Sequence, residues 1–105
     1  EAIAALDALA GDSAAPRSLR DLATVLGGQR RLEAGDTAAV KPHLASLVDS
    51  ASPWRHLARE LAALAAEAEG NRTEARALLR RLTDDLEAPQ GTRARAAELL
   101  QALPE

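Results

Sequence analysis

The 105-residue chain contains no cysteine, methionine, phenylalanine or tyrosine, and Trp54 is its single aromatic residue. The lack of cysteine excludes a disulfide framework, a thiolate nucleophile and a cysteine-type zinc site. Thirteen basic residues against sixteen acidic ones give a formal net charge of −3. Because single-strand binders combine a basic groove with aromatic stacking surfaces, this composition argues against nucleic acid as a partner. The sequence also has no apolar run of the roughly 18 residues that suggest a membrane-spanning helix.

Alanine, leucine and valine supply almost all of the 47% hydrophobic content. Alanine and leucine are strong helix formers, and small or branched side chains suit closely packed helices. Apolar residues spaced three and four apart therefore predict an all-α domain, whose short connections make sequential helices antiparallel neighbours. We expect six helices, at residues 2–10, 16–34, 37–49, 53–69, 72–86 and 91–103.

Three sequence signals mark where helices should begin. Ser52 followed by Pro53 suits an N-cap and a first helical position. Asn71, with Glu74 three residues later, resembles a capping box. Asp36 is expected to cap the corresponding helix of the preceding hairpin in the same way.

The helical pattern repeats along the chain. The corner Gly35-Asp36 returns 35 residues later as Gly70-Asn71. The apolar positions follow the same interval, so that Val40, Leu44 and Leu47 correspond to Ala75, Leu79 and Leu82, and Leu19, Leu22, Ala23 and Leu26 correspond to Trp54, Leu57, Ala58 and Leu61. A third copy opens the chain, where Glu1-Ala2, Leu6 and Leu9 have the spacing of Glu74-Ala75, Leu79 and Leu82. We therefore expect one domain that starts within a repeat, divided into residues 1–15, 16–52, 53–89 and 90–105.

A period near 34 residues in helix-turn-helix units resembles the tetratricopeptide repeat (TPR) family. In the second hairpin, Ala63 holds the small position of the first helix, and Ala75 and Leu79 hold the small and large positions of the second. The first hairpin has Gly28, Val40 and Leu44 at these places, and Pro53 and Pro89 end the two units. The resemblance implies antiparallel hairpins stacked as a short right-handed solenoid, with residues 1–15 as the second helix of a truncated repeat and residues 90–105 as a capping helix.

Two longer segments suggest a particular TPR-like family. SPWRHLARELAALAAEAEGNRTEARALLRRL and APQGTRARAAELLQAL resemble the carboxy-terminal part of the bacterial ancillary SecYEG translocon subunits. This resemblance implies a protein of the bacterial inner membrane with a periplasmic repeat domain that contacts the translocon and chaperones. The membrane anchor it implies would lie before Glu1.

The TPR resemblance also places a partner surface on the concave face formed by first helices. By position, this face comprises Val25, Gln29, Leu32 and Glu33 in the first hairpin, and Leu57, Glu60, Leu64 and Glu67 in the second. The face is mixed apolar and acidic, without the clustered lysine and arginine that grip a terminal carboxylate in some TPR domains. We therefore expect an apolar or helical partner segment.

In this interpretation, several helix residues have a packing role because they lie where two helices touch. Gly28, Ala63 and Ala75 are small because paired helices approach closely only where no side chain holds them apart. Val40, Leu44 and Leu79 are their large or branched counterparts. Trp54 has two possible roles, as a wedge between repeats or as an exposed interface anchor, and we favour the wedge.

No residue pattern predicts catalysis, a metal site or a cofactor. His43 and His56 lie on different predicted helices without partners at metal-ligand spacing. The serines at 13, 50 and 52 suit caps and turns, and Asp84-Asp85 suits a solvated helix end. Gly27-Gly28 lacks the spacing of a phosphate-binding loop. We expect neither an enzyme nor a small-molecule substrate.

Charged residues define two further surfaces, and the first leaves two interpretations open. The basic stripe of Arg72, Arg76, Arg80 and Arg81, the first three of which share one helix face, is either a solvated face or a dock for an acidic segment, and we favour the solvated face. At the carboxy-terminal end, Arg93, Arg95, Glu98 and Gln101 are expected to give the last helix a polar outer face.

The sequence thus predicts a non-catalytic protein-interaction module, with translocon subunits or periplasmic chaperones as suspected partners. The alternative is a self-associating TPR-like scaffold or adaptor with an unknown partner. Self-association would use the apolar residues from Ala2 to Leu9 at the amino-terminal edge, where the chain is expected to begin within a repeat.

Overall fold

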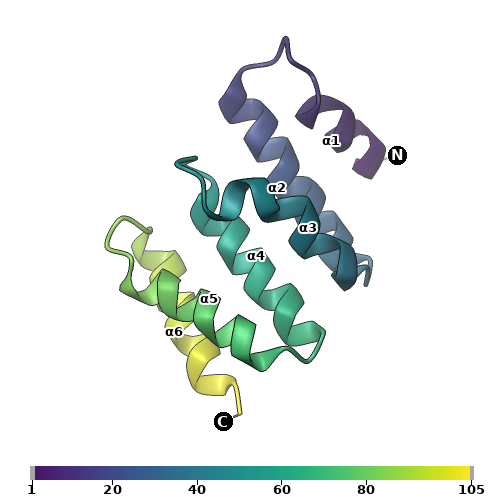
Figure 1. The fold of residues 1–105 in the computed structure, drawn as a ribbon. Coiled ribbons are helices and arrows are strands. Elements are labelled where there is room, and N and C mark those ends of the chain that lie inside the picture. Colours follow the sequence, from purple (N-terminus) through teal and green to yellow (C-terminus); the bar gives the residue numbers. More distant parts are fainter. Residues whose placement is uncertain (1, 105) are drawn as a thin grey trace.

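The computed structural model describes residues 2–104, so that Glu1 and Glu105, the first and last residues of the expected domain, lie outside the described part. Within residues 2–104 the chain is entirely helical and contains no strand, which confirms the predicted all-α class and the six helices. Figure 1 shows their arrangement. The helices are α1 (Ala2–Ala10), α2 (Arg17–Glu33), α3 (Thr37–Val48), α4 (Arg55–Ala68), α5 (Arg72–Asp84) and α6 (Gln90–Ala102).

The helices form a serial stack. Each helix packs against the next one in the chain, and α4 also contacts α2 and α6. Side chains of α3 and α5 also meet, as in the ion pair of Lys41 with Glu74, whereas α2 is the only helix packed against α1 among the described residues. The stack measures 44 × 29 × 18 Å, and its two termini lie at opposite ends (Figure 1). Among the described residues, no helix combines the length and the apolar character needed to cross a membrane.

Two glycine corners join α2 to α3 and α4 to α5 with the same backbone geometry. Gly35 and Gly70 have φ angles of +83° and +81°, in the left-handed region that favours glycine. The next residue closes each helix end, because the Asp36 N–H donates to the Arg31 carbonyl at 2.9 Å and the Asn71 N–H donates to the Ala66 carbonyl at 2.8 Å. This is the Schellman arrangement, which satisfies carbonyls that the last helical turn leaves free.

The beginnings of the helices agree less well with the sequence signals. Asn71 caps α5 as predicted, because its Oδ1 accepts from the Glu74 N–H at 3.2 Å. Asp36 makes no side-chain capping bond, so the prediction for α3 is wrong. The predicted start of α4 is also wrong by two residues, because Ser52 belongs to a turn that precedes the helix. In this turn Ser52 Oγ accepts from the Trp54 N–H, and the Ser52 carbonyl accepts from the Arg55 N–H. Pro53 lies in this turn and the helix begins at Arg55.

The two corners offer a matched test of capping. Replacing Asn71 by alanine removes the acceptor for the Glu74 N–H and should lower the free energy of unfolding by about 1 kcal/mol. Asp36→Ala removes no capping bond and should cost much less. Urea denaturation of both variants, followed by the fluorescence of Trp54, measures the difference. Equal losses in the two variants would contradict this account.

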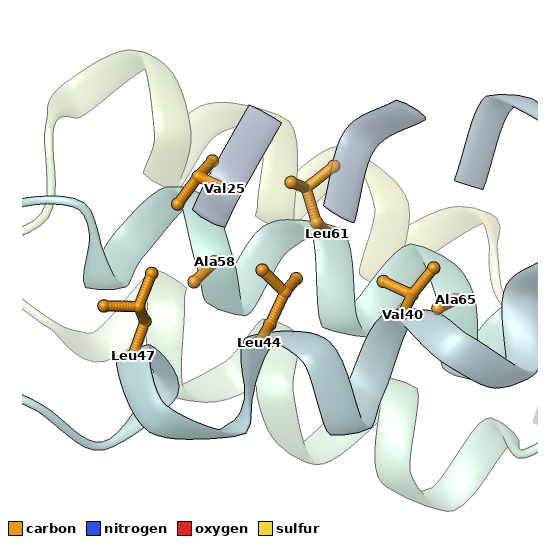
Figure 2. Packing of buried hydrophobic residues seen from close by; sticks show 7 residues of the cluster. All are labelled: Val25, Val40, Leu44, Leu47, Ala58, Leu61 and Ala65. Atoms are coloured by element: carbon orange, nitrogen blue, oxygen red, sulfur yellow. The ribbon is translucent and has the colours of Figure 1, made fainter. Parts of the chain in front are cut away.

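The core consists of two clusters that share helix α4. The first joins one residue of α2 to three of α3 and three of α4, namely Val25, Val40, Leu44, Leu47, Ala58, Leu61 and Ala65 (Figure 2). The second joins α4 to α5 and α6 through Ala62, Ala63, Leu78, Leu79, Leu82 and Ala96. All three residue pairs that the repeat aligns in α3 and α5 are buried: Val40 with Ala75, Leu44 with Leu79, and Leu47 with Leu82.

Close packing explains the small residue in the middle of α2. A Cβ atom added to Gly28 would lie 2.8 Å from Leu44 Cδ2, which is too near for any side chain. In the second hairpin, Ala63 and Leu79 lie together in the second cluster. Helices α2 and α3 therefore approach each other where glycine permits it.

Trp54 lies between the two hairpins. Its side chain packs against the first cluster while remaining partly exposed, and its indole Nε1–H donates to the Ser18 carbonyl of α2 at 3.1 Å. The contact joins the amino-terminal ends of α2 and α4, which run in the same direction. Trp54 therefore contacts both hairpins.

Candidate functional site

The predicted partner surface is only partly accessible. Its residues fall into three groups: Gln29, Glu33 and Glu67 are exposed, Leu32, Leu57 and Leu64 are half-buried, and Val25 and Glu60 are buried. Val25 has no exposed surface because it belongs to the first core cluster. Neither Val25 nor Glu60 is available to a partner in this structure, and both are removed from the candidate surface.

Glu60 is buried because α6 lies over it. Its side chain is 10% exposed, and its two carboxylate oxygens accept from Arg95 Nε at 2.8 Å and Arg95 Nη2 at 3.0 Å. Arg95 also donates to Thr92 Oγ1 at 3.3 Å, and the bond to Glu60 raises the pKa of Arg95. Arg95 is exposed, as expected of the polar outer face of the last helix, with 55% of its side chain accessible, while its guanidinium also reaches Glu60 of α4. Reversing the charge of Glu60 would disturb the docking of α6 as well as any partner contact.

An apolar recess lies beside this ion pair. It has a volume of about 150 Å³ and brings together three helices. Leu64 and Glu67, both predicted from the sequence, line it from α4, and Glu67 is the only charged residue among its lining. The lining residues that the prediction missed come from α4, α5 and the end of α6, and are Ala63, Leu79, Leu99, Ala102 and Leu103.

A second, wider groove lies at the opposite end of the stack. It is about 410 Å³ in volume and runs between α1 and α2. The predicted residues Gln29 and Glu33 belong to this groove, not to the recess. The structure thus places four residues of the predicted surface in two separate hollows, one at each end of the stack, while Leu32 and Leu57 pack against the first core cluster.

The basic stripe on α5 is interrupted. Arg76 donates to the carbonyls of Leu103 and Pro104 and so holds the carboxy-terminal segment against α5. Arg72 and Arg80 are exposed, and Arg81 pairs with Asp49 at 2.9 Å. Two of the four arginines of the stripe, Arg76 and Arg81, already bind groups of the chain itself, which favours a structural role for this charge.

A buried charged cluster joins the start of α4 to the segment after α5. Arg59 is 8% exposed and donates to the Val48 carbonyl at 2.7 Å and to Asp85 Oδ2 at 3.3 Å. The segment is therefore tied to α3 and α4, and the expectation that Asp84-Asp85 forms a solvated helix end is wrong for Asp85. His56 lies in the same cluster, 6% exposed, with Nδ1 3.6 Å from Asp85 Oδ2 and without a hydrogen-bond partner among the described residues.

The cluster shifts the pKa of two groups. Burial lowers the pKa of His56 below its ordinary value of 6.5, the charge of Arg55 lowers it further, and Asp85 opposes this. The Glu87 N–H, which donates to Asp85 Oδ1 at 2.9 Å, lowers the pKa of Asp85 below 3.8. Asp85 thus accepts from the Glu87 N–H and from Arg59, and these bonds join the segment after α5 to α4.

The His56 shift predicts a pH dependence of stability. The unfolded chain binds a proton on this histidine near pH 6.5, whereas the folded chain binds it only at lower pH. The free energy of unfolding should therefore fall as the pH drops below 6.5, by on the order of 1 kcal/mol per pH unit until the folded pKa is reached. His56→Leu should lose this slope in urea denaturation between pH 5 and pH 7.5.

The carboxylates of Asp7 and Asp85 do not interfere with this measurement. Their folded pKa values lie below 3.8, so the stability they contribute is lost only as the pH falls below that value. A slope above pH 5 that is the same in wild type and in His56→Leu would refute the assignment to this histidine.

Among the described residues, no group of three histidine or acidic side chains is arranged to hold a metal ion. No protein-family model matches the chain, and no curated protein or solved structure matches it.

Proposed function

We propose that the chain is a non-catalytic protein-interaction module built as a TPR-like, right-handed solenoid. Two features support the repeat architecture: glycine corners with the same geometry 35 residues apart, and contacts between the alternate helices α2, α4 and α6. Repeat proteins of this kind build extended binding surfaces from such stacked units. Because one scaffold serves many partners, the choice of partner depends on the surface itself.

The apolar recess is the observation that carries this proposal. It is a hollow of α4, α5 and α6 with aliphatic walls and a single carboxylate, that of Glu67. Such a site suits one or two aliphatic side chains of a partner segment, with a basic residue beside them to face Glu67. The recess lacks the basic residues that would hold a carboxylate.

The proposed partners are translocon subunits or periplasmic chaperones. This part rests on the resemblance of residues 52–82 and 88–103 to the ancillary SecYEG translocon subunits. By the same resemblance we propose that the chain lies on the periplasmic side of the bacterial inner membrane.

Affinity capture from detergent-solubilised bacterial inner membranes tests the proposal. The 105-residue chain is the bait, and SecY, SecE and SecG are detected with antibodies. Glu67→Lys and Leu64→Asp alter the recess, while Glu98→Lys and Leu86→Asp make the same changes at exposed positions elsewhere. Recovery that the recess variants lose and the control variants keep is the expected result. Failure to recover any translocon subunit would refute the translocon assignment, and equal recovery by all variants would refute the recess as the site.

A self-associating scaffold is the second candidate function. The exposed alanines of α1, at positions 2, 4, 5 and 8, favour it because they leave an apolar edge that α2 does not cover. Sedimentation equilibrium over a wide concentration range is the test. A monomer at all concentrations would exclude this candidate.

A further inference from the structure

The corner between α4 and α5 carries a sequence motif that the proposed function does not use. Asn71 is the only asparagine of the chain, and Arg72 and Thr73 follow it. An asparagine, any residue except proline, and then a serine or threonine form the acceptor motif for N-linked oligosaccharides. The other glycine corner has Asp36 and Ala38 at the matching positions, so it lacks both the asparagine amide and the hydroxyl.

The fold presents this motif at the surface. All residues from Glu69 to Thr73 are exposed. Gly70 has a φ angle of +81°, and a Cβ atom added to it would have no atom within 4 Å beyond its adjacent residues. The corner therefore projects into open space, as an acceptor motif requires. An enzyme can approach the side chains of Asn71 and Thr73 without displacing the core.

The Asn71 amide is held in a way that leaves one hydrogen for modification. Its Oδ1 accepts from the Glu74 N–H at 3.2 Å, and its Nδ2 donates to Glu74 Oε1 at 3.1 Å. An amide nitrogen carries two hydrogens, so one remains after the bond to Glu74. A sugar attached to Nδ2 replaces this second hydrogen and keeps both bonds in place. The cap of α5 is therefore compatible with an attached oligosaccharide.

A shallow hollow beside Asn71 offers the first sugar a surface. It lies between α3 and α5 and has a volume of about 80 Å³. Its buried part is aliphatic, and its more exposed part carries hydroxyl, ammonium and carboxylate groups. The aliphatic residues are Ala62, Ala65 and Ala66, and the polar ones beside Asn71 are Thr37, Lys41, Glu69 and Glu74. A sugar ring has an apolar face and a border of hydroxyl groups, which matches this combination.

We propose that Asn71 is an acceptor of an N-linked oligosaccharide, transferred by an oligosaccharyltransferase from a lipid pyrophosphate carrier. In this step Asn71 Nδ2 attacks C1 of the first sugar. The bond between Nδ2 and C1 forms, the bond between C1 and the pyrophosphate oxygen breaks, and the lipid pyrophosphate leaves with the electron pair. The Nδ2 proton passes to a base of the enzyme. The Thr73 hydroxyl belongs to the motif that the enzyme recognises.

The proposal rests on the location given under the proposed function, because the carrier and the acceptor must face the same side of the membrane. It does not depend on the apolar recess. The residues that line the hollow beside Asn71 and those that line the recess are two separate sets.

Periplasmic expression together with a transferase provides the test. The 105-residue chain is fused to a cleavable signal peptide and produced in a bacterial host that carries an oligosaccharyltransferase and its lipid-linked oligosaccharide. A host without the transferase gives the reference mass. Intact-mass spectrometry measures the added mass, and removal of the signal peptide, read from the same spectrum, verifies export. The variants are Asn71→Gln, Thr73→Ala, Thr73→Ser and Thr83→Ala.

The wild-type chain should gain the mass of one oligosaccharide, on Asn71, only in the host with the transferase. Asn71→Gln and Thr73→Ala should abolish this gain, whereas Thr73→Ser keeps the hydroxyl and should retain it. Thr83→Ala is the matched control, because Thr83 lies on the same helix outside the motif. Since Asn71→Gln also alters the cap of α5, Thr73→Ala, at an exposed position, keeps the assignment testable if that variant fails to fold.

A second measurement tests the fit of the oligosaccharide to the corner. The modified and unmodified chains are compared in urea denaturation. Their midpoints should agree, because the two bonds between Asn71 and Glu74 remain after modification. A lower midpoint for the modified chain would contradict the compatibility of the cap with the sugar.

Two outcomes would overturn the assignment of the acceptor. The first is an exported wild-type chain without added mass, and the second is added mass that persists in both Asn71→Gln and Thr73→Ala. Neither outcome bears on the translocon assignment, because the capture experiment uses unmodified bait. Conversely, failure of the capture leaves the acceptor test intact, since the signal peptide supplies the location.

Discussion

Replacing Leu44 by alanine should lower the free energy of unfolding by about 2 to 5 kcal/mol. Leu44 is fully buried in the first core cluster and contacts helices on both sides of α3. The substitution removes apolar contacts and leaves a cavity between α2 and α4, which the rigid helices cannot fill completely. For a domain of this size the loss is a large fraction of the total stability.

The measurement is urea denaturation at pH 7.5, followed by Trp54 fluorescence and by far-ultraviolet circular dichroism. Leu86→Ala is the matched control, because Leu86 is 85% exposed and should contribute little. A loss below 1 kcal/mol for Leu44→Ala, or equal losses for the two variants, would show that α3 does not pack as described.

Replacing Gly28 by leucine should lower the free energy of unfolding by about 1 to 3 kcal/mol. The first added atom already lies 2.8 Å from Leu44 Cδ2, and Leu44 is itself fully buried between α2 and α4. The helices must therefore separate, which weakens the first cluster. Gly91→Leu is the control, since a Cβ there meets only Arg95 Nη1 at 3.6 Å and leucine is the better helix former.

The two substitutions should not be additive. Leu44→Ala opens the space that a side chain at position 28 requires, so Gly28→Leu should cost less in the Leu44→Ala background than in wild type. A double-mutant cycle measures the coupling. Strict additivity would contradict direct contact between these two positions.

The helices could be predicted from the sequence because local patterns define them. Alanine and leucine at helical spacing give both the helix type and the buried face, and the glycines at 35 and 70 mark ends that only a left-handed residue can form. The corner geometry depends on a few neighbouring residues, so sequence and structure agree closely there.

Capping was less predictable because it depends on a single rotamer. Asp36 and Asn71 are both good N-cap residues, and both follow a glycine. Only Asn71 bonds to its helix, and its Nδ2 also donates to Glu74 Oε1 at 3.1 Å. The corresponding residue in the first hairpin is Ala39, which offers no such partner.

The surface was the least predictable part, because residues far apart in the chain decide which positions are exposed. Glu60 has the sequence character of a solvated residue, and only the placement of Arg95, 35 residues later, accounts for its burial. The recess was equally hard to predict, because it forms only where the end of α6 packs beside α4 and α5. A weak signal was present, since Leu99, Ala102 and Leu103 have the spacing of one helix face.

The serial packing of the helices also determines how the chain should open and close. Every contact between helices joins elements that are adjacent or next-but-one in the chain, so the fold can form from local encounters and should do so rapidly. Helix α4 contributes to both clusters, whereas α1 has one neighbour and no buried residue. Backbone amides should therefore exchange with solvent most slowly in α4 and fastest in α1, so that local unfolding begins at the amino-terminal end and leaves the remaining five helices folded.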